Sequence, residues 1–177
     1  RFRQVPTFGR DTIRRFSANV ADLKKLGARD FEDILQCSIP VLEGLLLEPY
    51  NSTVLDLLWT LTTWHALAKL RMHTTTTLKH LTHTTTALGR FLRQFKEHVC
   101  THFVTKELPR ESAARDVQIR LASDTQASPS NVTMPSGAVP RVKTFNLNTY
   151  KLHALGDYVE TIKTFGPSDN YSTQTVS

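Results

Sequence analysis

The sequence predicts an all-α fold: an irregular helical bundle with a long helical hairpin, a disordered linker and a separate C-terminal helix. Apolar residues recur at steps of three and four over most of the 177 residues, and no segment of any length alternates as a half-buried strand does. One stretch rich in Ser, Thr, Asn, Pro and Gly interrupts this helical pattern. We therefore expect a helical domain over 1–121, a flexible linker over 122–142, a C-terminal helix within 143–166 and a polar tail over 167–177.

The beginning of the helical domain is expected to contain short amphipathic helices. Apolar residues from Asp11 to Leu26 follow helical spacing, and Gly27 stands where a helix C-terminus favours glycine. Helical spacing resumes around 31–35. Ser38 and Pro40 then supply a cap and a first-turn proline for a short helix over 41–47.

A helical hairpin is expected over 54–103. The segment 54–72 is the most apolar and predicts a core helix with Trp59 and Trp64 packed inside and a buried hydrogen bond for His65. Charged residues interrupt it, which argues against a membrane span. The following segment carries an apolar stripe at steps of three and four: Leu78, Leu81, Thr85, Leu88, Leu92, Phe95 and Val99.

This stripe is expected to pack antiparallel on the preceding helix after a turn at 73–76. The alternative is a coiled-coil partner outside the chain. A last helix, from about 148 to 165, presents apolar residues on one face and ends at Gly166-Pro167.

The positive charge is concentrated at one end. The net charge is +6, and residues 1–29 contain eight basic and two acidic residues, whereas the remainder is balanced with fourteen of each. Such asymmetry suits contact with a polyanion such as DNA or RNA, and a solvated helix face is the alternative. The candidate DNA-binding residues are Arg10, Arg14, Arg15, Lys24 and Lys25, joined by Lys151 and His153, with Lys163 nearby, in the C-terminal helix.

Several classes of chemistry lack a sequence signal. Cys37 and Cys100 match neither a disulfide framework nor a structural zinc site, so a reducing intracellular compartment is expected. His98 and His102 share a helical face, but they lack a third ligand. No nucleotide-binding or common nucleophile motif occurs, so we expect no catalytic residue, metal, cofactor or small-molecule substrate. The first residues show no apolar run behind a basic head, so no signal peptide is expected, and the start at Arg1 suggests a piece of a longer protein.

Three blocks of the sequence resemble the C-terminal region of fungal DNA transposases of the Plavaka kind. The third block is the most specific, because its Lys-Leu-His helix is followed by Phe-Gly and then Tyr-Ser-Thr. The resemblance covers nearly the whole chain apart from the linker, and it is carried by residues 35–46, 64–74 and 145–158, with Phe165-Gly166 and 171–174.

The resemblance implies a parent protein that bound element DNA and cut it with acid-held divalent metal, in a catalytic core upstream of Arg1. This chain would then be a non-catalytic accessory region, nuclear, with DNA and the upstream catalytic region as partners. Gln174 to Ser177 depart from the Gly-Glu-Leu-x-His segment that follows in relatives, and threonines near Thr75 and Thr84 replace acidic and polar residues. The alternatives are a helical protein-interaction module and a decayed transposon relic without activity.

Overall fold

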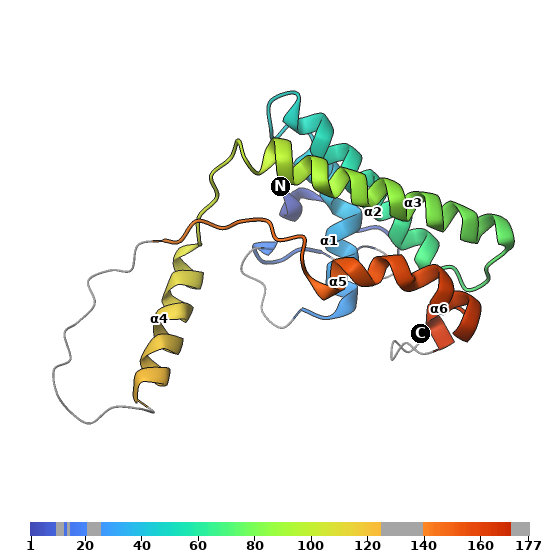
Figure 1. Cartoon of the computed structure of the whole chain (residues 1–177). Helices are drawn as coiled ribbons and strands as arrows, with labels where there is room; N and C mark the ends of the chain where they lie inside the picture. The colour runs from blue at the N-terminus through green and yellow to red at the C-terminus, as the bar shows by residue number, and fades with distance from the viewer. Residues whose placement is uncertain (10–12, 14, 21–25, 125–139, 171–177) are drawn as a thin grey trace. The chain divides into compact units, whose positions relative to one another are not determined.

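The computed structural model describes residues 1–9, 13, 15–20, 26–124 and 140–170 (Figure 1). These residues contain no strand beyond two isolated β-bridges, so the all-α prediction is confirmed for them. A π-helical turn, Phe95–Val99, continues α3, and the described residues also include the short 3-10 turns Phe2–Gln4, Ala154–Asp157 and Ser168–Asn170. The helices are α1 (Ala28–Leu42), α2 (Tyr50–Ala68), α3 (Thr75–Gln94), α4 (Pro109–Asp124), α5 (Tyr150–His153) and α6 (Tyr158–Phe165).

The expected hairpin forms the centre of the first of two compact units, which comprises Arg1–Val99 and Leu147–Ser177. Helix α3 returns along α2, and the two lie side by side (Figure 1). Leu81 and Leu88 of the stripe are 0% and 1% exposed, and they share one core with residues of α2 and α6. Burial of such side chains supplies about 1.5–3 kcal/mol each. The buried core residues are Leu57, Trp64, Ala68, Leu81, Leu88 and Ile162.

Threonines begin α3 and are accommodated within it. Thr74 is the N-cap, and its hydroxyl accepts a hydrogen bond from the backbone N–H of Thr77. Thr82, Thr85 and Thr86 each donate their hydroxyl proton to the carbonyl four residues earlier. Their polar groups are therefore satisfied inside the helix despite their low helix propensity.

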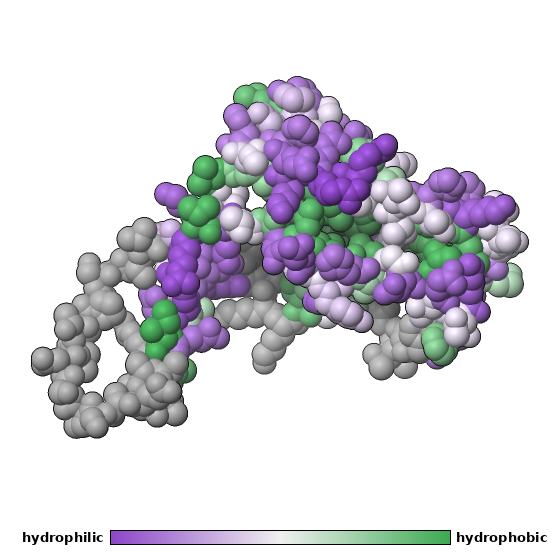
Figure 2. All heavy atoms as spheres, viewed as in Figure 1, coloured by the Kyte–Doolittle hydropathy of each residue, from purple (hydrophilic) through white to green (hydrophobic). Residues whose placement is uncertain are grey.

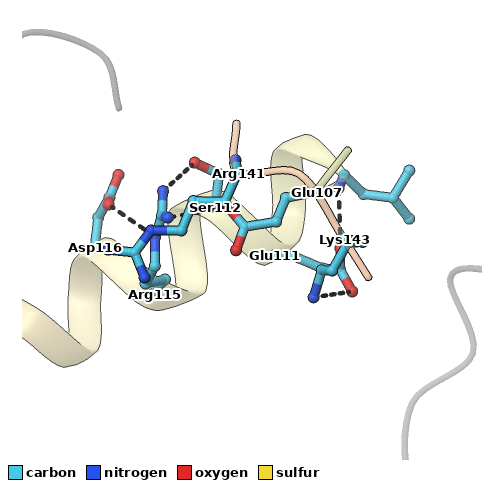
Figure 3. A network of polar contacts seen from close by, with 8 residues as sticks. Glu107, Glu111, Ser112, Arg115, Asp116, Arg141 and Lys143 are labelled. Carbon is cyan, nitrogen blue, oxygen red and sulfur yellow. Dashed lines mark hydrogen bonds and ion pairs between the residues drawn. The ribbon is translucent and has the colours of Figure 1, made fainter. Parts of the chain in front are cut away.

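The second unit, Cys100–Asn146, contains α4 and a short pairing of two backbone segments, 105–107 and 141–143, which we call the clip. A β-bridge joins Lys106 to Val142, with the N–H of Glu107 donating to the carbonyl of Arg141 over 2.8 Å. The Arg115 guanidinium lies 3.1 Å from Glu107, and Figure 3 shows it at the centre of the surrounding polar network. This ion pair ties α4 to the clip.

Three of the expected helices differ from the observed ones. The residues described between Asp11 and Leu26 contain no α-helix, because Ile13 exchanges both backbone hydrogen bonds with Phe8 in a bridge. One helix, α1, covers the segment expected around 31–35 and runs through Pro40 to Leu42, and residues 43–47 of the helix expected over 41–47 are not helical. Cys37 and Val41 are both buried four residues apart, so one packed face continues across the proline.

The grouping of segments also differs from the expected boundaries. Residues 122–124 of the predicted linker belong to α4, and Val142 at its far end belongs to the clip. Residues 125–139 of the predicted linker lie outside the described residues. The C-terminal helix is not separate, because Ile162 is 5% exposed within the common core. In the predicted polar tail, Ser168 donates to the carbonyl of Ala68, and 171–177 are not described.

Candidate nucleic-acid interface

The sequence-predicted DNA-binding residues are described only in part. Arg10, Arg14, Lys24 and Lys25 lie outside the described residues. Arg15 is exposed on irregular backbone rather than on the predicted helix, and Lys151 and His153 are exposed on α5. The further candidate Lys163 has its ammonium 2.7 Å from Glu160, which partly neutralises it.

The outward side of α3 carries a line of polar residues, three of them Lys or Arg, that the sequence analysis did not single out. We call this set the outer face of α3. Its residues follow one another at steps of four, three, four and three, which keeps them on one line directly opposite the buried stripe. All five are exposed, and they are Lys79, His83, Thr86, Arg90 and Arg93.

The outer face is positively charged along α3 itself, and the next acidic residue, Glu97, follows in the π-helical turn after the helix. Helix α3 contains no Asp or Glu. In the part of the chain that the structure describes, Lys79, Arg90 and Arg93 form no ion pair, in contrast to Lys69, whose ammonium lies 2.7 Å from a Glu32 carboxylate oxygen. Unpaired cations keep their full attraction for an external polyanion.

The side chains of this face suit phosphate binding. Arginine presents a planar fork that matches two phosphate oxygens, and lysine offers a compact charge. The Arg90 guanidinium lies over the Phe91 ring, 5.1 Å from its centroid, which orients its stem along the helix. Figure 2 shows hydrophilic residues gathered over α3 in the same view as Figure 1.

One sequence signal points to this face. No acidic residue occurs from Leu57 to Lys96, while six basic residues do. Residues 30–177 contain equal numbers of basic and acidic residues, so their net charge does not reveal this acid-free segment. The acidic residues lie before and after it. Within this stretch the spacing of Lys79, Arg90 and Arg93 places these basic residues on one side of α3, which the total charge does not show.

A polar cluster between α1 and α2 has a structural role. Glu32 lies 2.7 Å from Lys69 and 3.7 Å from Nε2 of His65. Burial lowers the pKa of His65 below its ordinary value; Glu32 opposes this, and Lys69 adds to it. The cluster joins two helices through a partly exposed ion pair.

Other candidate sites are not supported by the described residues. No group of three or more His, Cys, Asp or Glu among them can hold a metal. Burial, followed by the nearby charge of Asp33, raises the pKa of Cys37. A reactive thiol has a lowered pKa instead, so Cys37 is not a candidate nucleophile. None of the described helices is both long and apolar enough to cross a membrane.

Comparisons with known proteins identify no relative. No protein-family model matches the chain, and no curated protein or solved structure is significantly similar to it.

Proposed function

We propose that this chain is a non-catalytic helical region of a transposase-derived protein that works in the nucleus and contacts the DNA backbone through the outer face of α3. The observation that carries the DNA contact is the line of exposed cations on a helix without acidic residues. The transposase origin rests on the resemblance of the three sequence blocks described above.

This proposal changes the assignment of the contacting residues. The segment from Asp11 to Leu26 was expected to form an amphipathic helix, but its described residues contain no α-helix. Arg15 and Lys151 remain secondary candidates, since both are exposed. The outer face of α3 is the better candidate because its cations lie on one rigid element.

The apolar stripe of α3 no longer supports the alternative of a protein-interaction module. The stripe from Leu78 to Val99 was the surface expected to pair with another chain. Leu81 and Leu88 of that stripe are buried against α2 and α6, so it is occupied within this chain.

The test is binding of the full chain to a mixed-sequence DNA duplex, followed by fluorescence anisotropy at about 50 mM salt. We expect binding by the wild type and an affinity about tenfold lower for the double variant Arg90→Gln, Arg93→Gln. The matched control, Arg110→Gln with Lys143→Gln in the second unit, removes the same charge and is expected to change affinity by about twofold or less.

Absence of wild-type binding at that salt concentration would contradict the proposed function. A loss of affinity confined to a variant of Arg14, Arg15, Lys24 and Lys25, with the α3 variant unaffected, would contradict the assignment to α3. Circular dichroism of each variant confirms that the helices are retained.

A further inference from the structure

We infer that the clip of the second unit binds an extended acidic segment of another protein, which pairs beside Val142 as an added strand. This inference is independent of the proposed DNA contact, because it uses other residues and another kind of interaction. The site lies wholly within the second unit. It combines unpaired backbone groups with positive charge on both sides of them.

The backbone groups of Val142 point away from the segment with which it is paired. Lys106 and Val142 form the antiparallel bridge of the clip. The hydrogen bonds of this pairing belong to the neighbouring residues, each over 2.8 Å: Glu107 N–H to Arg141 C=O, and Lys143 N–H to Thr105 C=O. In this arrangement the two residues of the central pair direct their own N–H and C=O groups outward.

The outward groups of Val142 form an open edge. Within the part of the chain that the structure describes, neither its N–H nor its C=O takes part in a hydrogen bond, and the residue is 58% exposed. The Lys143 ammonium lies 3.6 Å from a Glu111 carboxylate oxygen on α4, so by alternation the Val142 side chain faces away from α4 (Figure 3). Such an edge is a template for an extended peptide, whose backbone supplies the missing donor and acceptor.

Positive charge on both sides of Val142 favours an acidic partner. Arg141 and Lys143 are exposed, and Arg141 forms no ion pair with any described residue. Opposite charges on neighbouring strands stabilise their pairing, so Glu or Asp in the incoming segment is favoured. The other outward edge of the clip, at Lys106, is less suitable because the acidic Glu107 adjoins it.

Two other occupants of this edge fit less well. A second copy paired through the same segment would bring Arg141 and Lys143 close to their own counterparts, and like charges across paired strands destabilise them. Nucleic acid is attracted by the same charges, but it has no amide backbone that can pair with the edge. An acidic peptide satisfies both the charges and the backbone groups.

The test measures binding of the full chain to a short fluorescent peptide that alternates glutamate and valine. We expect saturable binding, and an affinity about tenfold lower or worse for the same peptide with methylated backbone nitrogens, which cannot pair with an edge. A peptide that alternates lysine and valine is expected to bind about tenfold more weakly or not at all. The glutamate peptide should also slow hydrogen exchange at the Val142 amide.

A variant tests the edge from the side of the protein. Val142→Pro removes the outward N–H and leaves both hydrogen bonds of the clip in place, because proline is tolerated at an edge where its nitrogen faces outward. We expect it to bind the glutamate peptide about tenfold more weakly or worse. The matched control, Val142→Thr, keeps the N–H and is expected to change affinity by about twofold or less. Hydrogen exchange at the Glu107 amide shows whether the clip is retained.

Several results would overturn this inference. Equal affinity of the wild type for the methylated and unmethylated glutamate peptides would show attraction by charge alone, and this comparison decides even if Val142→Pro disrupts the clip. Full affinity of Val142→Pro with the clip retained would exclude pairing at this edge. Loss of peptide binding in the Arg90→Gln, Arg93→Gln variant would place the peptide on α3 instead. We expect that variant to bind the peptide as the wild type does.

Discussion

Trp64 and Trp59 lie on the same helix in opposite environments. Trp64 is 5% exposed, its indole N–H donates to Oγ1 of Thr85 over 2.9 Å, and its ring meets Tyr158 edge to face with centroids 4.8 Å apart. Trp59 is 68% exposed, so the expectation that both tryptophans are in the core is wrong for it. The single hydrogen bond and the ring contact fix Trp64 as the anchor between α2, α3 and α6.

Fluorescence distinguishes the two tryptophans. We expect the Trp59→Phe variant, which retains Trp64, to emit at shorter wavelength and to resist acrylamide quenching, because its indole is buried and hydrogen-bonded. The Trp64→Phe variant should show the reverse. Equal quenching of both variants in their folded states would contradict these environments.

His65 predicts a pH dependence of stability. Burial lowers its pKa from 6.5, so the unfolded chain binds this proton more readily than the folded protein does. Its contribution to stability is therefore complete above pH 6.5 and is lost as the pH falls through the lowered pKa of His65. We expect urea titrations to show a steeper loss of unfolding free energy on acidification for the wild type than for His65→Gln. The difference in slope is at most about 1.4 kcal/mol per pH unit, since one proton is involved. An identical or steeper slope for the variant would contradict this role.

The burial of single residues could be predicted from the sequence where a helix has apolar residues on one face only. Leu81 and Leu88 belong to a stripe with polar residues on the opposite face, so their burial follows from spacing alone. Helix α2 is apolar around most of its surface, and spacing cannot tell which of its tryptophans faces inward. That depends on where α3 and α6 pack, which is tertiary information.

At the scale of elements, local signals were reliable for the long helices and misleading for the short ones. The hairpin of α2 and α3 was predicted because each helix carries many apolar contacts at helical spacing. The break expected before Pro40 did not occur, since a continuous buried face outweighs one lost backbone hydrogen bond. In the segment from Asp11 to Leu26, the described residues Ile13, Phe16 and Val20 are only half-buried, and they adopt other structure.

An ion pair adds to the backbone hydrogen bonds that hold the clip of the second unit. Glu107 accepts from Arg115 and from the backbone N–H of Arg141, and the Glu107 and Arg115 side chains are 10% and 17% exposed. Removing the carboxylate takes from a largely buried guanidinium its nearest acidic partner and leaves it with the more distant Asp116 and Ser112, at a cost of about 1–3 kcal/mol. We expect Glu107→Ala to reduce hydrogen-exchange protection of the amide at residue 107 about tenfold or more.

The matched control for this clip is Lys143→Ala. Lys143 lies 3.6 Å from Glu111 in an exposed pair, which contributes at most about 1 kcal/mol. Protection in Glu107→Ala that equals the wild type, or a control that loses as much as Glu107→Ala, would contradict the role of the ion pair.

At the scale of the whole molecule, segments distant in sequence share one core. Residues before Val99 and after Leu147 form the first unit, with residues 100–146 as the second. The sequence indicated the composition change around 122 but not this grouping, because a linker says nothing about whether the helices on either side pack together. The outer face of α3 was missed for a related reason: it is a property of the folded helix rather than of total charge.

The shared core predicts that α6 contributes to the stability of the first unit. We expect Ile162→Ala to lower the free energy of unfolding by about 2–5 kcal/mol, because a fully packed side chain is removed. The control Phe165→Ala, at a residue 68% exposed on the same helix, should change it by about 0.5 kcal/mol or less. Similar effects of the two substitutions in thermal unfolding would contradict the docking of α6.

The central claim is that the cations of α3 contact DNA phosphates, and the salt dependence of affinity tests it most directly. The measurement compares the slope of log affinity against log salt concentration for the wild type and for a triple variant, Lys79→Gln, Arg90→Gln, Arg93→Gln. If all three side chains contact phosphates, the slope becomes shallower by about 2.7, about 0.9 for each contact. An unchanged slope in a folded triple variant would show that DNA, if bound, is held elsewhere on the chain, and would contradict the claim.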